Sequence, residues 1–260
     1  MDMLKTHQTI ADRYCETIIN DPMLEGVAYL GGLARGFADE FSDIDIALFS
    51  YEPMPDLQLG EHLTPDGHVL ELFNVVMNEG FEKWSPIQKE AYEECVIVID
   101  KNKNVSAFLN AALLFKDDYR IKKALELIFE IAWHGWVYTP YKNTTTKGYY
   151  WVLPEDLWFR RNNAANAFFV AQKSIDHFID LMFVINRKWS PDYKWRYIKY
   201  LNLPVLPENA KANLDFLLFE SWNMANWEKK RRIFQEMLDE AVLMLMPDLP
   251  DDHWYDIIDH

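Results

Sequence analysis

The stretch from residue 27 to residue 49 constrains the fold more than any other part of the chain. It reads Val-Ala-Tyr-Leu-Gly-Gly-Leu-Ala-Arg-Gly-Phe-Ala-Asp-Glu-Phe-Ser-Asp-Ile-Asp-Ile-Ala-Leu-Phe. The apolar run from Val27 to Leu30 predicts a short buried strand. Gly31 and Gly32 then allow a sharp turn and a close approach of the backbone to a ligand such as a phosphate, because neither residue carries a Cβ atom.

Two aspartates follow the glycine turn at the start of a second predicted strand. Asp43 and Asp45 alternate with isoleucines before an apolar run that ends at Phe49. Side chains at i and i+2 of a strand lie on the same face, so the two carboxylates should stand side by side. They repel each other unless a cation lies between them. Mg²⁺ suits such a pair, because it binds one or two carboxylates together with water and phosphate oxygens.

This pattern resembles the polymerase-beta-like nucleotidyltransferase superfamily, in which a strand, Gly-Gly or Gly-Ser, a short helix and Asp-x-Asp on the next strand follow one another. Gly31, Gly32, Asp43 and Asp45 match it, and Arg35 and Ser42 resemble a variant of the pattern found in small bacterial members. Asp-x-Asp alone occurs by chance in many α/β proteins, but the whole combination is more specific. Gly32 stands where many members have serine. Backbone N–H groups, aided by Arg35, are therefore expected to bind the triphosphate.

A third carboxylate comes from the strand predicted after the turn at Thr64–Gly67. In the superfamily a strand beside the Asp-x-Asp strand supplies it, and Glu71 is the acidic residue that fits. The resemblance therefore implies that Asp43, Asp45 and Glu71 hold Mg²⁺, as two ions, with ATP or another nucleoside triphosphate as co-substrate. The alternative is that Glu71 faces solvent on an edge strand.

The hydrophobic period changes from strand to helix after the predicted strand at Cys95–Asp100. We expect an α/β (α+β) fold with two domains. Residues 1–115 would form a mixed-sheet nucleotidyltransferase domain, and residues 116–260 an all-helical substrate-binding domain. Its longest helices are predicted at 155–187 and 208–246.

Charge is distributed unevenly between these halves. Residues 1–115 carry 7 basic and 20 acidic side chains, whereas residues 116–260 carry 19 and 21. A polynucleotide partner is disfavoured, because its phosphates require lysine and arginine. A cationic small molecule would be attracted instead. With no apolar run of 18 residues, no signal peptide and only Cys15 and Cys95, we expect a cytoplasmic monomer or homodimer without a membrane span, disulfide framework or structural zinc site.

The second half offers weaker candidates. Small bacterial aminoglycoside (kanamycin) nucleotidyltransferases have a general-base glutamate after a phenylalanine in the first helices of their second domain, and that resemblance implies Glu130 for this role. Aromatic residues around a polar loop could line a cleft that stacks on sugars or bases: Trp133, Trp136, Tyr149, Tyr150 and Trp151. Basic residues near loops could reach a triphosphate: Lys142, Lys147, Arg160 and Arg161. The run Lys229–Arg232 is interpreted as a solvated helix surface.

The leading hypothesis is transfer of a nucleoside monophosphate to a hydroxyl of a small molecule, such as an aminoglycoside antibiotic, with release of pyrophosphate. Such an enzyme would confer antibiotic resistance. One alternative is a nucleotidyltransferase-fold binding or antitoxin-like protein that acts on a protein partner, or an inactive chain. RNA-directed transfer is a third possibility, which the acidic charge disfavours.

Overall fold

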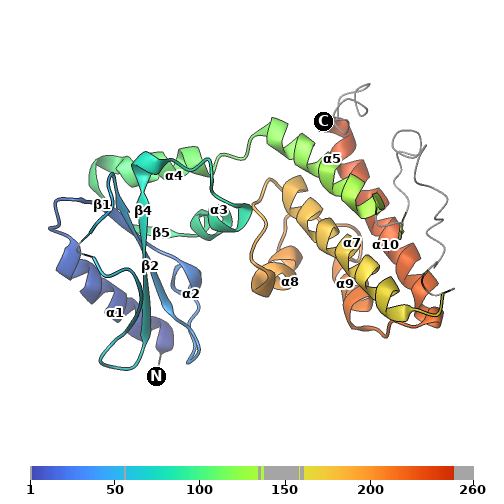
Figure 1. The fold of residues 1–260 in the computed structure, drawn as a ribbon, viewed down its shortest axis with the longest axis horizontal. Coiled ribbons are helices and arrows are strands. Elements are labelled where there is room, and N and C mark those ends of the chain that lie inside the picture. Colours follow the sequence, from blue (N-terminus) through green and yellow to red (C-terminus); the bar gives the residue numbers. More distant parts are fainter. Residues whose placement is uncertain (1, 56, 134–135, 138–157, 159–160, 249–260) are drawn as a thin grey trace. The chain divides into compact units, whose positions relative to one another are not determined.

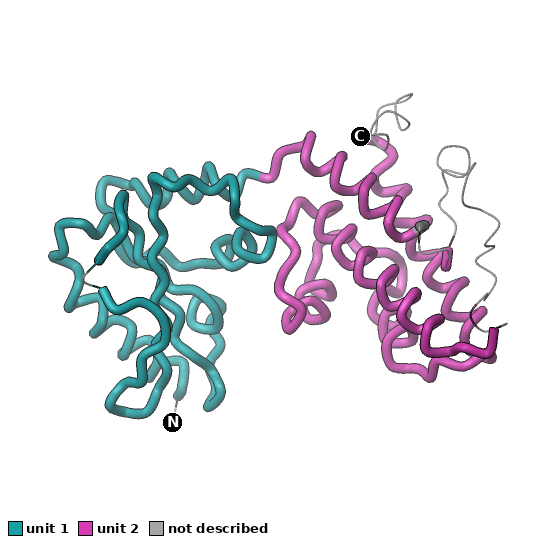
Figure 2. The backbone as a smooth tube through the Cα atoms, viewed as in Figure 1, with its two compact units in different colours: residues 1–114 teal, residues 115–260 magenta. Residues whose placement is uncertain are grey.

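The structure is a computed structural model that describes residues 2–55, 57–133, 136, 137, 158 and 161–248 (Figure 1). The chain divides into two compact units, residues 1–114 and residues 115–260 (Figure 2). Each unit has hydrophobic clusters of its own. Unit 1 contains a sheet with helices, and the described residues of unit 2 contain helices without a strand. The α/β (α+β) fold class predicted from the sequence is therefore confirmed.

Unit 1 is built on a five-stranded mixed sheet with the strand order β3-β4-β2-β1-β5. The strands are β1 (Leu24–Tyr29), β2 (Ile44–Ser50), β3 (Gly60–Leu63), β4 (Val69–Val76) and β5 (Val96–Asp100). Strands β2 and β4 are parallel, and the other neighbouring pairs are antiparallel. The predicted turn joins β3 to β4 as a hairpin, in which Gly67 takes a positive φ of 83° and its N–H donates to the Thr64 carbonyl.

Helices cover the two faces of this sheet. Helix α1 (Met3–Ile18) presents a buried stripe of four residues: His7, Ala11, Cys15 and Ile18. It packs with one set of strand residues, represented by Ile46 and Leu48, while Ala47 and Phe49 pack with α4 (Asn104–Ala112) and with the end of α3 (Pro86–Glu93). Because side chains alternate along a strand, β2 residues with odd numbers lie on the α3/α4 face and those with even numbers on the α1 face.

The described residues of unit 2 form helices around one apolar core that includes residues from Ala124 to Leu245. The helices are α5 (Asp117–Trp133), α7 (Ala164–Ile185), α8 (Tyr193–Leu201), α9 (Ala210–Phe219) and α10 (Met224–Leu245). The start predicted for the helix at 155–187 is too early, because Asn163 caps α7 by accepting a hydrogen bond from the Asn166 N–H at 3.0 Å.

The single helix predicted at 208–246 is wrong, because α9 and α10 are separate. Asn223 begins α10 by accepting a hydrogen bond from the Asn226 N–H at 3.0 Å. Lys230 of α10 reaches back to the C-terminal end of α9. Its Nζ donates to the carbonyls of Phe216, Leu217 and Glu220 at 2.9, 2.8 and 2.7 Å. The buried ammonium bonds to carbonyls at the C-terminal end of α9, where a helix offers fewer N–H partners, and so stabilises the break.

Candidate functional site

Three carboxylates meet at one end of β2 and β4. Asp45 lies on β2 directly opposite Glu71 on β4 in the parallel register. Asp43 immediately precedes β2, so it lies just outside the strand rather than on it as predicted. One ligand oxygen from each of Asp43, Asp45 and Glu71 lies within 4.8 Å of the other two. Asp43 is exposed and the other two are half-buried, which leaves the cluster open to a ligand from solvent.

Gly31 brings the backbone close to this cluster. It opens the short helix α2 (Gly31–Ala34) with a positive φ of 55°. A Cβ atom added here would lie 1.9 Å from Oδ2 of Asp45. The preceding residue is tied to the same strand, since the Leu30 N–H donates to the Asp45 carbonyl at 3.0 Å. Only glycine combines this backbone conformation with the space that the Asp45 carboxylate occupies.

Gly32 has a different reason to lack a side chain. A Cβ atom at this position would lie 2.7 Å from the Phe37 carbonyl oxygen, and the Phe37 N–H donates to the Gly32 carbonyl at 2.9 Å. The turn thus closes on itself at Gly32. A serine side chain at this position would clash with the Phe37 backbone.

Arg35 already has carboxylate partners. Its Nε lies 2.5 Å from Oε2 of Glu94, and a second guanidinium nitrogen lies 3.6 Å from Oε1 of Glu90 on α3. Glu90 is buried, so this ion pair fastens the glycine turn to α3. Binding of a triphosphate by Arg35 stays a prediction, and it would require the guanidinium to share or exchange these partners.

Ser42 closes the loop that leads to the carboxylates. Its hydroxyl donates to Oδ1 of Asp39 at 2.9 Å and accepts from the Asp39 N–H at 3.0 Å. The same carboxylate accepts from the Phe41 N–H at 3.0 Å. These bonds set the path of the chain into β2. A nucleotide-binding role for Ser42 stays a prediction, whereas its role in shaping the loop follows from these contacts.

The donor set fits a hard divalent cation. Three carboxylates without sulfur or imidazole in the group are typical of sites for Mg²⁺ or Mn²⁺, which prefer oxygen ligands. Close carboxylates destabilise one another in their charged forms, and a bound cation removes this repulsion. Within the described residues, it is the one group of three or more Asp, Glu, His or Cys side chains whose ligand atoms all lie within 4.8 Å of one another.

A pair of histidines lies near the cluster, and the sequence reading did not single it out. His7 of α1 is fully buried, and its ring centroid lies 5.0 Å from that of His68, which precedes β4. Burial lowers the pKa of His7; the nearby His68 lowers it further, whereas the charges of Asp43 and Asp39 raise it. A polar residue at the head of the otherwise apolar stripe of α1 was the available signal.

Unit 2 contains Glu130, the proposed base, at a half-buried position of α5. The cleft role predicted for Trp136 is wrong, because this residue is 1% exposed and stacks on Phe234 at 4.6 Å between ring centroids. It belongs to the core. The other predicted cleft and loop side chains lie outside the described residues, except Arg161, which lies over the Trp158 ring. Those outside are the side chain of Trp133, whose backbone ends α5, and the residues Lys142, Lys147, Tyr149, Tyr150, Trp151 and Arg160.

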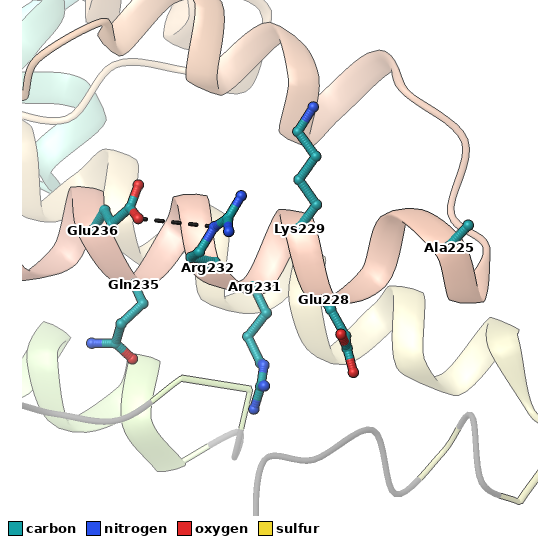
Figure 3. A pocket seen from close by; sticks show the side chains of 7 residues that line it. All are labelled: Ala225, Glu228, Lys229, Arg231, Arg232, Gln235 and Glu236. Atoms are coloured by element: carbon teal, nitrogen blue, oxygen red, sulfur yellow. Dashed lines mark ion pairs between the residues drawn. The ribbon is translucent and has the colours of Figure 1, made fainter.

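The basic run at 229–232 is not uniformly solvated as predicted. Lys230 is fully buried, and the other three side chains line a pocket of about 570 Å³ on α10 (Figure 3). Arg232 pairs with Glu236 at 4.0 Å across that surface. The pocket has both charge signs and lacks a clustered set of metal ligands among its described lining. The carboxylate cluster of unit 1 is therefore the stronger candidate for chemistry.

No described helix is both long and apolar enough to cross a membrane. No protein-family model and no curated protein sequence matches the chain. Among solved structures, it is similar to the crystal structure of a nucleotidyltransferase-like protein from Exiguobacterium sibiricum 255-15, with 12% sequence identity and a TM-score of 0.47. The match covers 92% of this chain and 75% of that one. At this level of similarity, a functional assignment must rest on the strand-end residues of this chain.

Proposed function

We propose that this chain transfers a nucleoside monophosphate from a nucleoside triphosphate to a hydroxyl group of a small molecule and releases pyrophosphate. The observation that carries the proposal is the convergence of Asp43, Asp45 and Glu71 within 4.8 Å, beside a glycine that approaches Asp45 too closely to bear a side chain. Carboxylates at one strand end next to such a turn suit a nucleotide that arrives with a hard cation.

Asp43, Asp45 and Glu71 would hold the metal. Mg²⁺ bound there would neutralise the triphosphate and favour in-line attack at the α-phosphorus. The parallel register fixes Asp45 against Glu71, so these two carboxylates enter the reaction already positioned. Asp43, at the exposed start of β2, can adjust to the arriving nucleotide. We assign the ligand role to all three.

The reaction exchanges one phosphorus–oxygen bond for another. The acceptor oxygen bonds to the α-phosphorus, the bond from that phosphorus to the bridging oxygen breaks, and pyrophosphate leaves with the bonding electrons. The acceptor proton must pass to a base. We assign this role to Glu130, whose half-buried position on α5 is compatible with a general base.

The acceptor class follows from charge. Residues 1–115 carry 13 more acidic than basic side chains, and such a field attracts an amine-bearing molecule. An aminoglycoside-like acceptor has both the cationic amines and the hydroxyl groups that the proposal needs. Because Trp136 is buried, stacking on that residue no longer supports a sugar acceptor. Neutral sugars, lincosamide-like molecules and peptides are the alternatives to be tested beside it.

A binding test comes first, because it needs no acceptor. Each nucleoside triphosphate is added with Mg²⁺ and the melting temperature is measured, since a ligand that binds only the folded state raises its stability. At least one triphosphate should raise the melting temperature with Mg²⁺ and lose this effect with EDTA. Asp45→Asn should abolish the shift, and Asp66→Asn, an exposed change in the β3–β4 turn, should keep it.

The transfer test incubates the chain with Mg²⁺, the bound triphosphate and a panel of aminoglycosides and neutral sugars. A nucleotidyl mass increment on an aminoglycoside is the expected result, and modification of neutral acceptors only would refute the charge argument. Asp45→Asn should reduce the rate by more than about a hundredfold, since even indirect metal partners contribute that much. Binding without transfer to any acceptor would favour the alternative, a binding or antitoxin-like protein.

The base is tested separately on α5. Glu130→Gln should lower kcat by at least about a hundredfold, because general base catalysis contributes this much or more. Glu126→Gln is the matched control, since Glu126 lies on the same helix, is exposed and pairs with Lys123 at 3.1 Å. Equal rates for the two variants would remove Glu130 from the mechanism and leave the metal assignment intact.

A further inference from the structure

His7 is a buried imidazole whose two nitrogens lack a hydrogen-bond partner in the described part of the chain. Its side chain is fully buried, and neither Nδ1 nor Nε2 forms a hydrogen bond with any described residue. Leaving a buried polar group unpaired costs about 1–3 kcal/mol. Native structures therefore nearly always supply a partner, which can be protein, water, an ion or a ligand. The position of His7 implies a partner that does not belong to the described chain.

His68 lies against His7 and is held there by its own backbone. The ring centroids are 5.0 Å apart, with an angle of 79° between the ring planes. The His68 N–H donates to Oγ1 of Thr64 at 3.0 Å, and its carbonyl accepts from the Thr64 N–H at 2.8 Å. The hairpin turn thus presents the imidazole to α1. The angle between the ring planes rules out parallel stacking, and both His7 nitrogens lack a hydrogen-bond partner among the described residues.

The ring separation matches two imidazoles that share one metal ion. With a zinc–nitrogen bond of about 2.1 Å, each ring centre lies about 3.2 Å from the ion, and a tetrahedral angle then places the two centres about 5.2 Å apart. The observed separation is 5.0 Å. Neutral imidazole is the commonest protein ligand for such ions. We propose that His7 and His68 bind a borderline divalent cation of the Zn²⁺ class, with water completing its coordination.

This site is distinct from the carboxylate cluster. His7 and His68 belong to the α1 side of the sheet, whereas Asp45 and Glu71 share the strand parity of Ala47 and Phe73, which pack on the opposite side. The ligand types also differ, because imidazole nitrogen suits Zn²⁺ and carboxylate oxygen suits Mg²⁺.

The surroundings of the histidine pair favour a cation. The charges of Asp43 and Asp39 raise the pKa of His7, which is the direction in which a negative field acts on an imidazole. His68 is only half-buried, so an ion can reach the histidine pair from solvent.

The test measures metal binding and needs no enzymatic activity, so it does not depend on the proposed function. Zn²⁺ is titrated calorimetrically into the full chain carrying Asp45→Asn and Glu71→Gln, which disables the carboxylate cluster. Adding His68→Gln should weaken Zn²⁺ binding at least tenfold while circular dichroism shows a retained fold. Adding His62→Gln should leave it unchanged, because His62 lies on β3 and its Nε2 pairs with the Gln58 carbonyl oxygen at 2.7 Å.

A second measurement uses the wild-type chain, in case the combined substitutions at Asp45, Glu71 and His68 prevent folding. Imidazole ¹⁵N resonances of His7 and His68 are followed by NMR during Zn²⁺ addition, and one nitrogen of each ring should shift to a metal-bound value. Equal Zn²⁺ affinity with and without His68→Gln would overturn the proposal, as would unshifted His7 and His68 nitrogens at saturating Zn²⁺. Equal losses for His62→Gln and His68→Gln would overturn it as well.

Discussion

Gly31→Ala should weaken metal binding by displacing the Asp45 carboxylate, in addition to the loss of stability that backbone strain causes. Gly31 has a φ of 55°, and its Cβ would lie 1.9 Å from Oδ2 of Asp45. An L-residue in the left-handed region costs about 1–2 kcal/mol. An ordinary contact needs at least about 3.4 Å, so the Asp45 carboxylate must retreat by about 1.5 Å. A side-chain end moves at little cost in stability, but a displacement of about 1 Å at a reacting centre can cost about a hundredfold in rate.

Gly36→Ala is the matched control for this change. Gly36 lies in the same turn with a φ of 72°, and a Cβ there would meet no atom within 4 Å. Urea titrations should therefore show a similar decrease in the free energy of unfolding for both variants. The expected decrease is about 1–2 kcal/mol, the energy of a left-handed backbone conformation at an L-residue. Only Gly31→Ala should weaken Mn²⁺ binding, followed by electron paramagnetic resonance, by about tenfold or more. Equal Mn²⁺ affinities in the two variants would refute the link between Gly31 and the Asp45 carboxylate.

Further predictions concern a second glycine and a buried lysine. Gly32→Ser should lower the free energy of unfolding by about 2 kcal/mol in urea titrations, because its Cβ would overlap the Phe37 carbonyl; an unchanged midpoint would contradict this. Lys230→Met should lower the free energy of unfolding by about 3 kcal/mol, because it removes three hydrogen bonds to carbonyls at the end of α9. Burial lowers the pKa of Lys230 to about 8, so the unfolded chain binds more protons between pH 8 and pH 10.5. Wild-type stability should rise with pH there more steeply than that of Lys230→Met; equal slopes would refute this.

Local hydrophobic periodicity was the main basis for predicting the strands of unit 1 and the faces of their side chains. The side chains of a strand alternate with a period of two, so a parity argument was enough to predict that Asp43 and Asp45 share one face, whereas Glu71 came from the resemblance to the superfamily. The register then sets Asp45 and Glu71 opposite each other on β2 and β4. Asp43 lies one residue before β2, which shows that strand ends are less well determined by pattern than strand faces.

Contacts between residues far apart in sequence account for what the pattern missed. Arg35 forms ion pairs with Glu94 and Glu90, which lie more than fifty positions later, and the sequence around Arg35 does not predict these partners. Lys230 ends α9 from the following helix, so its role could not be read from a run of four basic residues. The His7–His68 contact likewise joins α1 to the β3–β4 turn. Propensity and period describe neighbours along the chain, whereas these effects come from tertiary packing.

The stability of unit 1 and its proposed chemistry depend on different parts of the same strands. Ile44, Ile46 and Leu48 are fully buried, and each such side chain contributes about 1.5–3 kcal/mol by leaving water. The carboxylates stand at the strand end, where their mutual repulsion opposes folding in the absence of a cation. Asp45→Asn removes one of these charges without changing the shape of the side chain. It should therefore abolish metal-dependent function with an unchanged or slightly higher melting temperature, and a clear loss of stability would show that Asp45 supports the fold rather than the chemistry.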